Sequence, residues 1–122
     1  MTEETLNEID RLLAEQVCAR HIMRYARLLD SSDFATVASM YTADGRFARP
    51  ADPSNVIHGR EAILASLLAP PPRNSMHVVS NIEVEVESPT SASAISNLVL
   101  FLGSSGTPPV AIEGTMTGHF RD

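Results

Sequence analysis

The stretch from Arg24 to Phe34 reads Arg-Tyr-Ala-Arg-Leu-Leu-Asp-Ser-Ser-Asp-Phe, and the rest of the chain can be arranged around it. It contains the end of one predicted helix and the start of another. The pair Ser31-Ser32 interrupts the helical pattern, and Ser32 or Asp33 can cap the helix that follows. Within this stretch, Tyr25 and Asp30 fall where a polar pair would look into the protein interior. The residues before and after this stretch supply the rest of that interior.

Residues 3–30 are predicted to form one long amphipathic helix. Thr5 and Glu8 have capping-box spacing and indicate its start. Ile22, Ala26 and Leu29 widen the apolar face toward the C-terminal end, so we expect this end to be buried more deeply than the start. The inward stripe, with apolar residues every three or four positions, is expected to comprise Leu6, Ile9, Leu13, Val17, Arg24/Tyr25 and Leu28.

Helical and extended segments alternate in the middle of the chain. A short second helix is predicted from Phe34 to Tyr41, stopping at Asp44-Gly45. Short strands are expected at residues 45–49 and 56–58, on either side of a loop rich in turn-forming residues. A third helix over residues 60–69 must end at Pro70-Pro71-Pro72, because proline lacks the backbone donor that a helix needs.

The C-terminal part of the chain is predicted to be β. Residues 76–87 alternate between apolar side chains and the glutamates 83, 85 and 87. Residues 92–102 are apolar on both parities, which favours a central strand covered on both sides, and residues 110–120 form a third strand. Helices followed by a curved antiparallel sheet are an α+β layout, here in a single domain over residues 1–122. A sheet bent around the long helix would enclose a cone-shaped cavity.

Composition and charge exclude several classes of partner. The formal net charge is −6 and no segment is rich in arginine, so neither nucleic acid nor a membrane surface is an expected partner. One cysteine, Cys18, cannot form an internal disulfide bond. The acidic N-terminus lacks the pattern of a signal peptide, and no apolar run approaches the ~20 residues of a membrane span. We therefore expect a cytoplasmic protein.

Several short motifs occur in a specific order along nearly the whole chain. They are residues 24–30 with Asp33-Phe34, then Tyr41-Thr42-Ala43-Asp44-Gly45-Arg46-Phe47, His58-Gly59-Arg60-Glu61-Ala62-Ile63, Met76-His77 with Asn81, and Gly118-His119-Phe120-Arg121-Asp122. Together they resemble the SnoaL-like branch of the NTF2-like (nuclear transport factor 2-like) superfamily. The resemblance implies a cone-shaped α+β barrel with one deep apolar pocket, in a homodimer or larger homo-oligomer.

The resemblance implies a range of functions. Members include polyketide cyclases, dehydratases resembling scytalone and bile-acid dehydratases, steroid isomerases, and non-catalytic small subunits of ring-hydroxylating dioxygenases. Because the fold serves so many chemistries, it does not choose among them. Members normally continue into a final strand with Gly-Trp-Arg-Ile, whereas this sequence stops at Asp122 and has no tryptophan. Either that strand is absent here or a partner covers the sheet edge.

Asp30 and His77 are the first candidate catalytic residues. In the dehydratase members, the aspartate that matches Asp30 pairs with a histidine across the pocket, and such a pair can transfer protons near neutral pH. Alternatively, Asp30 only ends the first helix and His77 is a surface histidine. Strand parity favours that alternative for His77, which shares a face with the glutamates at 83, 85 and 87. The pocket interpretation therefore requires a bulge near Ser80.

Tyr25 is the third candidate catalytic residue, because its hydroxyl can donate to a substrate carbonyl or a developing oxyanion. It lies five residues before Asp30, which puts the two side chains about 140° apart around an ideal helix. Both can face one cavity only if the helix ends near Leu29. Otherwise Tyr25 is a core residue. Further substrate-binding candidates are Asn97, expected to be buried on the central strand, Tyr41, Phe47 and Arg49, which could meet a carboxylate at the pocket mouth.

Neither a metal nor a cofactor is expected. The four histidines lack the spacing of a metal site, and no glycine-rich phosphate loop is present. The resemblance and these residues together predict an enzyme that carries out cofactor-free dehydration, isomerisation or cyclisation of a small apolar carbonyl compound. The alternative is a non-catalytic ligand-binding or assembly subunit, similar to the small subunit of a dioxygenase.

Overall fold

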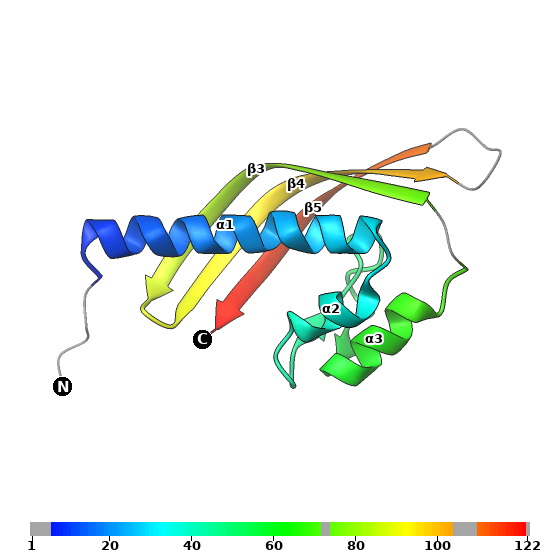
Figure 1. Cartoon of the computed structure of the whole chain (residues 1–122), viewed down its shortest axis with the longest axis horizontal. Coiled ribbons are helices and arrows are strands. Elements are labelled where there is room, and N and C mark those ends of the chain that lie inside the picture. The colour runs from blue at the N-terminus through cyan, green and yellow to red at the C-terminus, as the bar shows by residue number, and fades with distance from the viewer. Residues whose placement is uncertain (1–5, 72–73, 104–109, 122) are drawn as a thin grey trace.

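The chain folds into a helical part and an antiparallel sheet that lies beneath its longest helix (Figure 1). The computed structural model describes residues 6–71, 74–103 and 110–121, the last range for its backbone only. This part of the chain contains α1 (Glu8–Asp30), α2 (Phe34–Ser39), β1 (Arg46–Phe47), β2 (Ile57–His58), α3 (Arg60–Leu68), β3 (Asn74–Ser88), β4 (Ser91–Gly103) and β5 (Val110–Arg121). The predicted α+β layout is confirmed. No helix in the described ranges is long and apolar enough to cross a membrane.

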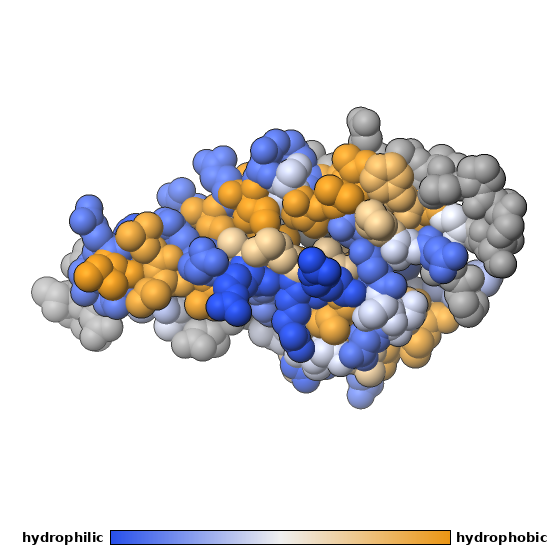
Figure 2. Space-filling model, turned by 45° about the horizontal axis from the view of Figure 1, so that its top comes forward, coloured by the Kyte–Doolittle hydropathy of each residue, from blue (hydrophilic) through white to orange (hydrophobic). Residues whose placement is uncertain are grey.

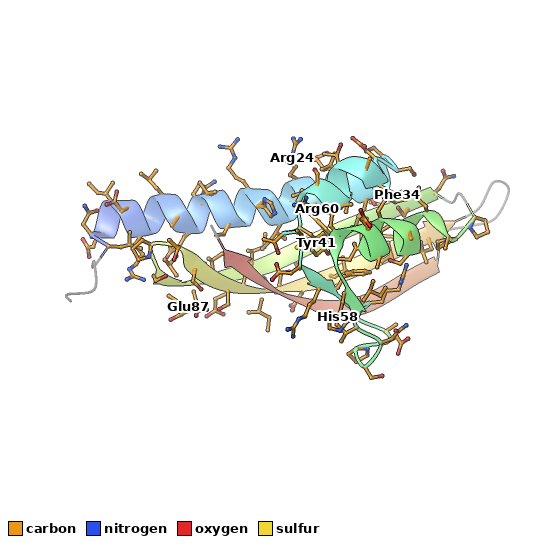
Figure 3. The ribbon with its side chains drawn as sticks, turned by 90° about the horizontal axis from the view of Figure 1, so that it is seen from below. Arg24, Phe34, Tyr41, His58, Arg60 and Glu87 are labelled. Carbon is orange, nitrogen blue, oxygen red and sulfur yellow. The ribbon has the colours of Figure 1, made fainter. Side chains whose placement is uncertain are left out.

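The strands form two separate antiparallel sheets. The larger one has the order β3-β4-β5, and the smaller one pairs β1 with β2. Helix α1 packs on the larger sheet, mainly against β3, while α2 and α3 pack against each other beside the smaller sheet. Figure 3 shows the resulting layers, with Arg24 on the solvent side of α1 and Glu87 beyond the opposite face of the sheet.

Helix α1 begins and ends at residues with cap chemistry. The side chain of Asn7 accepts a hydrogen bond from the Asp10 backbone N–H at 2.8 Å, so the helix begins at Glu8. Thr5, predicted to cap the helix, lies outside the described residues. At the other end, the N–H of Ser31 reaches the Arg27 carbonyl, and Ser32 turns the chain with φ of 61°. Helix α1 therefore ends at Asp30, where the sequence predicted a break.

The side of α1 that faces the sheet differs from the expected one. Cys18, Ile22 and Ala26 are buried, whereas the predicted inward residues are largely exposed: Ile9 by 70%, Leu13 by 60% and Val17 by 66%. Both sets repeat every four residues, so periodicity alone does not say which one meets the sheet. The expectation of deeper burial toward the C-terminal end is confirmed. Figure 2 shows apolar side chains over the N-terminal end of α1 and strongly hydrophilic ones along its middle.

Strand β4 is central in the sheet, as predicted, but it is not covered on both sides. The residues of its inner face are buried: Ala92, Ala94, Ser96 and, farther along, Leu98. On the outer face, Ile95 is 44% and Phe101 37% exposed. Among the described residues nothing packs on that outer face. Apolar residues at both odd and even positions of this strand therefore did not mean that both of its faces are buried.

A β-bulge in β3 inverts the side-chain alternation along the strand. Ser80 pairs with Asn97 and Glu83 with Ile95, so Asn81 and Ile82 stand opposite a single residue of β4. Asn81 has φ of 53°, the left-handed value found at bulges. Odd-numbered residues before the bulge and even-numbered residues after it therefore face α1. The bulge that the pocket interpretation of His77 requires near Ser80 is confirmed.

The segment that connects the helices to the small sheet is fixed from both sides. Val37 of α2 and Ile63 of α3 are fully buried where the two helices meet. The N–H of Gly59 donates to the Gly45 carbonyl at 2.8 Å, with Gly59 at φ of 91°, a value that favours glycine. These contacts hold residues 41–49, which carry several of the candidate site residues, in a defined position.

Candidate functional site

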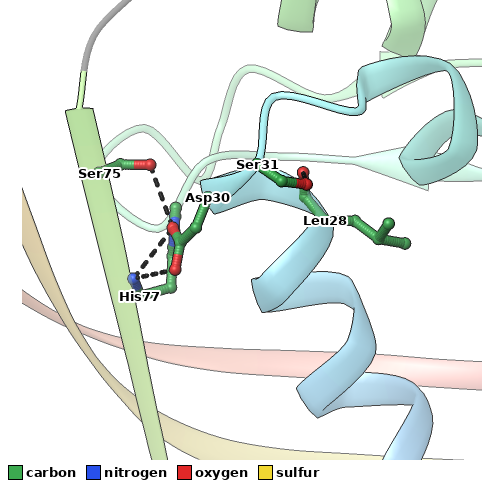
Figure 4. Close-up of polar contacts among 5 residues, drawn as sticks. All are labelled: Leu28, Asp30, Ser31, Ser75 and His77. Atoms are coloured by element: carbon green, nitrogen blue, oxygen red, sulfur yellow. Dashed lines mark hydrogen bonds and ion pairs between the residues drawn. The ribbon is translucent and has the colours of Figure 1, made fainter.

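The end of α1 and the beginning of β3 bring together the first two candidate residues. The Nδ1 atom of His77 lies 2.6 Å from Oδ1 of Asp30. Figure 4 shows the carboxylate of Asp30 between Ser75 and His77. Both side chains are shielded from water, since that of His77 is 14% and that of Asp30 24% exposed. A hydrogen bond of this length between two such groups is of the strong, charge-assisted kind. His77 thus lies on the helix side of the sheet and is not the surface histidine that strand parity favoured.

The carboxylate of Asp30 accepts hydrogen bonds from residues of β3 and not from the turn that follows α1. The backbone N–H of His77 donates to Oδ2 at 2.9 Å and to Oδ1 at 3.1 Å, and the Ser75 hydroxyl donates to Oδ1 at 3.1 Å. The turn is closed instead by the Ser31 hydroxyl, which donates to the Leu28 carbonyl. Ser75 was missed in the sequence. It lies two residues before His77, so once the bulge is known its position on the same face follows from the alternation.

This arrangement leaves the second imidazole nitrogen ready for chemistry. An ionised carboxylate only accepts hydrogen bonds, so Nδ1 of His77 carries the hydrogen that points to Asp30. In the neutral imidazole the lone pair is then on Nε2, and no hydrogen bond between described residues reaches that atom. Asp30 can hold the ring in place and stabilise the imidazolium that forms when Nε2 takes a proton.

A second group gathers Tyr25, Tyr41, Phe47 and Arg49. The hydroxyls of Tyr25 and Tyr41 lie 2.7 Å apart, and the two rings meet edge to face with 6.0 Å between their centroids. Phe47 packs against Tyr41 in the same manner at 6.3 Å. The guanidinium of Arg49 lies 5.5 Å from the centre of the Phe47 ring, a cation–π contact. Four candidate residues thus form one cluster: Tyr25 of α1, Tyr41 just after α2, Phe47 of β1 and Arg49 just after β1.

Burial raises the pKa of both phenols of this cluster, which at neutral pH are protonated already. It raises the pKa of Tyr25, and the hydrogen bond from Tyr41 and the charge of Arg49 offset only part of that effect. It raises the pKa of Tyr41 far above its ordinary value, with a further contribution from the neighbouring Tyr25 phenol. One hydroxyl of the pair donates to the other, which leaves the second hydroxyl hydrogen for an acceptor outside the pair.

Helix geometry relates the two groups. Tyr25 and Asp30 both belong to α1, and their Cα atoms lie about 7.5 Å apart along its axis, at ~1.5 Å per residue. The helix continues through Asp30 and does not stop at Leu29. No hydrogen bond between described residues joins the cluster to the Asp30–His77 pair. The two groups are therefore carried by one helix, with Tyr25 and Asp30 about 140° apart around its axis.

Asn97 does not belong to either group. It was predicted to be a buried polar residue, but its side chain is exposed. It pairs with Ser80 in the register of the sheet and points to the outer face, away from α1 and His77. The prediction of burial is wrong because the even-numbered residues of β4 face α1, and Asn97 lies between them.

The deep apolar pocket implied by the resemblance stays a prediction. A surface hollow of about 740 Å³ runs along a flank of α1, and neither Asp30 nor His77 lines it. Its lining comprises Val17, Arg20, His21, Met23, Arg24, Arg27, Leu28 and Ser31. In the described part of the chain, no three His, Cys, Asp or Glu side chains gather in a way that could hold a metal ion.

Comparisons with known proteins place this geometry in context. The family model described as SnoaL-like domain matches residues 10–122. None of the curated proteins matches the chain. Several solved structures share its fold.

A candidate scytalone dehydratase from Novosphingobium aromaticivorans superposes with a TM-score of 0.85 at 19% identity, over 95% of this chain and 78% of that one. An NTF2-like protein with a cystatin-like fold from the same organism gives a TM-score of 0.73 at 26% identity, over 91% and 74%. The beta subunit of a candidate aromatic-ring-hydroxylating dioxygenase, again from that organism, gives 0.74 at 11% identity, over 91% and 80%. Enzymes and a subunit of an enzyme complex thus share this fold.

Proposed function

Because the chain belongs to the SnoaL-like domain family of the NTF2-like superfamily, we propose that it is an enzyme that moves a proton next to a carbonyl group of a small apolar compound. The reaction is a dehydration, an isomerisation or a cyclisation. The observation that carries this proposal is the 2.6 Å contact between Nδ1 of His77 and Oδ1 of Asp30. That contact orients an imidazole whose other nitrogen is left for a substrate.

His77 is the general base in this proposal. Its Nε2 removes a proton from the carbon beside the carbonyl, and the ionised Asp30 stabilises the imidazolium that results. The electron pair of the broken C–H bond passes to the carbonyl oxygen, which becomes an enolate. In a dehydration, the enolate expels a β-hydroxyl group, and the imidazolium returns its proton to that leaving oxygen. In an isomerisation, the proton returns to a different carbon.

The tyrosine pair supplies the stabilisation of the enolate. A phenol that stays protonated is a suitable donor to a developing oxyanion, because it offers a hydrogen bond without adding charge to the free site. Tyr25 belongs to the same helix as Asp30, so the donor and the carboxylate that positions the base are held by one rigid element. The fold of the candidate scytalone dehydratase, similar at a TM-score of 0.85, is compatible with an elimination of this type.

Exchange of protons in D₂O tests the proposal without knowledge of the natural substrate. We expect the protein to accelerate exchange of the α-protons in a panel of small apolar ketones and β-hydroxy ketones, followed by proton NMR. His77→Gln and Asp30→Asn should reduce the accelerated rate by about 10²-fold or more, the usual range for a general base. His58→Gln is the matched control, since His58 is an exposed histidine of β2 and makes none of the contacts of the Asp30–His77 pair. Exchange that is equal in all three variants would contradict the proposal.

A second candidate function is assembly, and the outer face of the sheet favours it. Met76 is 58%, Val78 43%, Ile95 44% and Phe101 37% exposed on that face. A contiguous apolar surface of this kind is typical of an interface. The dioxygenase beta subunit that shares the fold belongs to an enzyme complex. We propose that the occupant here is a second copy of this chain.

The distribution of charge on β3 supports a twofold arrangement. The apolar residues Met76 and Val78 lie at one end of the strand, and Glu83, Glu85 and Glu87 lie on the outer face at the other end. When two such faces meet about a twofold axis through the apolar half, the acidic ends point away from each other. Repulsion between the glutamates is then avoided, and assembly and catalysis are compatible because His77 lies on the opposite face.

A further inference from the structure

We propose that the substrate of this site carries a carboxylate, and that Arg49 binds it beside the Tyr25–Tyr41 pair. The inference rests on the function proposed above and narrows it to apolar organic acids. The sequence alone predicted only that Arg49 could meet a carboxylate at the mouth of a pocket. The contacts of the folded chain give that possibility a defined geometry.

Arg49 is a half-buried cation that has no acidic partner among the side chains that the structure describes. Its Nη2 donates to the Ser66 carbonyl of α3 at 3.1 Å, and its guanidinium lies over the Phe47 ring. No carboxylate in the described part of the chain lies within ion-pair distance of it. A guanidinium has five N–H donors, so most of them are left over after the bond to Ser66. Partly buried charges in proteins are normally paired, and a bound anion is the pairing that this one lacks.

The tyrosine hydroxyls stand close to this cation. The charge of Arg49 acts on Tyr25 in the direction that lowers its pKa, although burial raises that pKa more. One hydroxyl hydrogen of the Tyr25–Tyr41 pair is left for an outside acceptor. A carboxylate has two oxygens, which match the planar guanidinium fork, and the free phenol hydrogen is left for the enolate oxygen. The aromatic faces of Tyr41 and Phe47 provide an apolar wall for the carbon skeleton.

The charge of the whole protein gives this cation a further role. With a formal net charge of −6, the chain repels small anions in general. An organic acid would enter only if a local positive charge received it. Arg49 is held in place on one side by Ser66 and on the other by Phe47, so that charge is positioned before the ligand arrives.

Ligand binding without turnover tests the inference. Cyclohexanecarboxylate and cyclohexanecarboxamide have the same ring and nearly the same shape, but only the first is charged. Tyr25 and Tyr41 are the two tyrosines of the chain, which has no tryptophan, so intrinsic fluorescence reports on this cluster. We expect the acid to bind about tenfold or more tightly than the amide, as one charge-assisted hydrogen bond predicts.

Variants then show which cation is responsible. Arg49→Gln should abolish the preference for the acid, whereas Arg49→Lys should keep part of it. Arg46→Gln is the matched control, because Arg46 is an exposed arginine of the same small sheet. Thermal melting of each variant shows that it is folded. Equal binding of acid and amide by the wild-type protein, no binding of either, or an equal loss in Arg46→Gln and Arg49→Gln would overturn the inference.

The two proposals can fail separately. His77→Gln should bind the acid as the wild-type protein does while it loses the exchange of α-protons. If no variant affects exchange but Arg49→Gln still loses the preference for the acid, the acid–base function is overturned and the carboxylate site stands. If exchange depends on His77 but the acid has no advantage over the amide, the carboxylate site is overturned and the acid–base function stands.

Discussion

The imidazole of His77 lies against the carboxylate of Asp30, with 2.6 Å between Nδ1 and Oδ1, although 47 residues separate them in the chain. The contact joins the last residue of α1 to β3, and the backbone N–H of His77 reinforces it. The same carboxylate therefore fastens the helix to the sheet and prepares the imidazole for proton transfer. Variants of Asp30 change both properties, whereas variants of the His77 side chain keep the backbone contact.

Asp30→Ala is therefore expected to destabilise the protein more than His77→Ala. Loss of Asp30 leaves the Ser75 hydroxyl and the His77 N–H without their acceptor, which costs about 2–3 kcal/mol of unfolding free energy. His77→Ala removes one hydrogen bond, a cost of about 1 kcal/mol. Urea denaturation of both variants measures the difference. Ser31→Ala serves as the control, since Ser31 is exposed and next in the chain. Asp30→Ala with no greater effect than Ser31→Ala would contradict this account.

The tyrosine pair predicts an unusual alkaline titration. Burial raises the pKa of Tyr25 and Tyr41, the two tyrosines of the chain. Above pH ~10 the unfolded chain releases phenol protons that the folded chain retains, so the unfolding free energy falls as the pH rises further. Ultraviolet difference absorbance should show phenolate in 8 M urea near pH 10, but only at higher pH in the folded protein. A folded-state titration at the ordinary value would show that the pair is not buried.

Local signals in the sequence predicted the element that organises the site. Ser31-Ser32 was expected to end the first helix, and Ser31 does close it through its N–H and its hydroxyl. The position of Asp30 at the helix end follows from that break. The partner of Asp30 did not follow from local pattern, because strand alternation placed His77 on the solvent face. The resemblance to a family supplied the pairing, and the bulge at Asn81 supplies its physical reason.

Asn81 is accordingly expected to be sensitive to substitution although it is exposed and touches neither Asp30 nor His77. Its φ of 53° suits glycine and asparagine but not a β-branched residue. Asn81→Val should lower the unfolding free energy by about 1–3 kcal/mol, while Asn81→Gly should be close to neutral. The same change at Ser80→Val, an exposed neighbour without positive φ, is the control. If Ser80→Val and Asn81→Val cost the same, the bulge does not depend on residue 81.

Which apolar stripe meets which surface could not be read from the pattern. Helix α1 has two stripes with four-residue spacing, and β4 is apolar on both parities. A repeat shows that a face exists, but the packing partner decides whether it is buried. The small residues at 92, 94 and 96 are buried on the inner face of β4, and the larger Ile95 and Phe101 are left outside. Size, more than hydrophobicity, separates the two faces of this strand.

Two exposed apolar surfaces thus compete as interfaces, and one pair of substitutions separates them. Phe101→Lys places a charge in the apolar half of the outer face, opposite Met76 in the register, where Phe101 is 37% exposed. Leu13→Lys places the same charge on α1, where Leu13 is 60% exposed. Sedimentation velocity should show a homodimer of the wild-type protein and of Leu13→Lys, and a monomer for Phe101→Lys. The reverse result would assign the interface to α1, and monomers in all three would contradict self-association, leaving the outer face for a different partner.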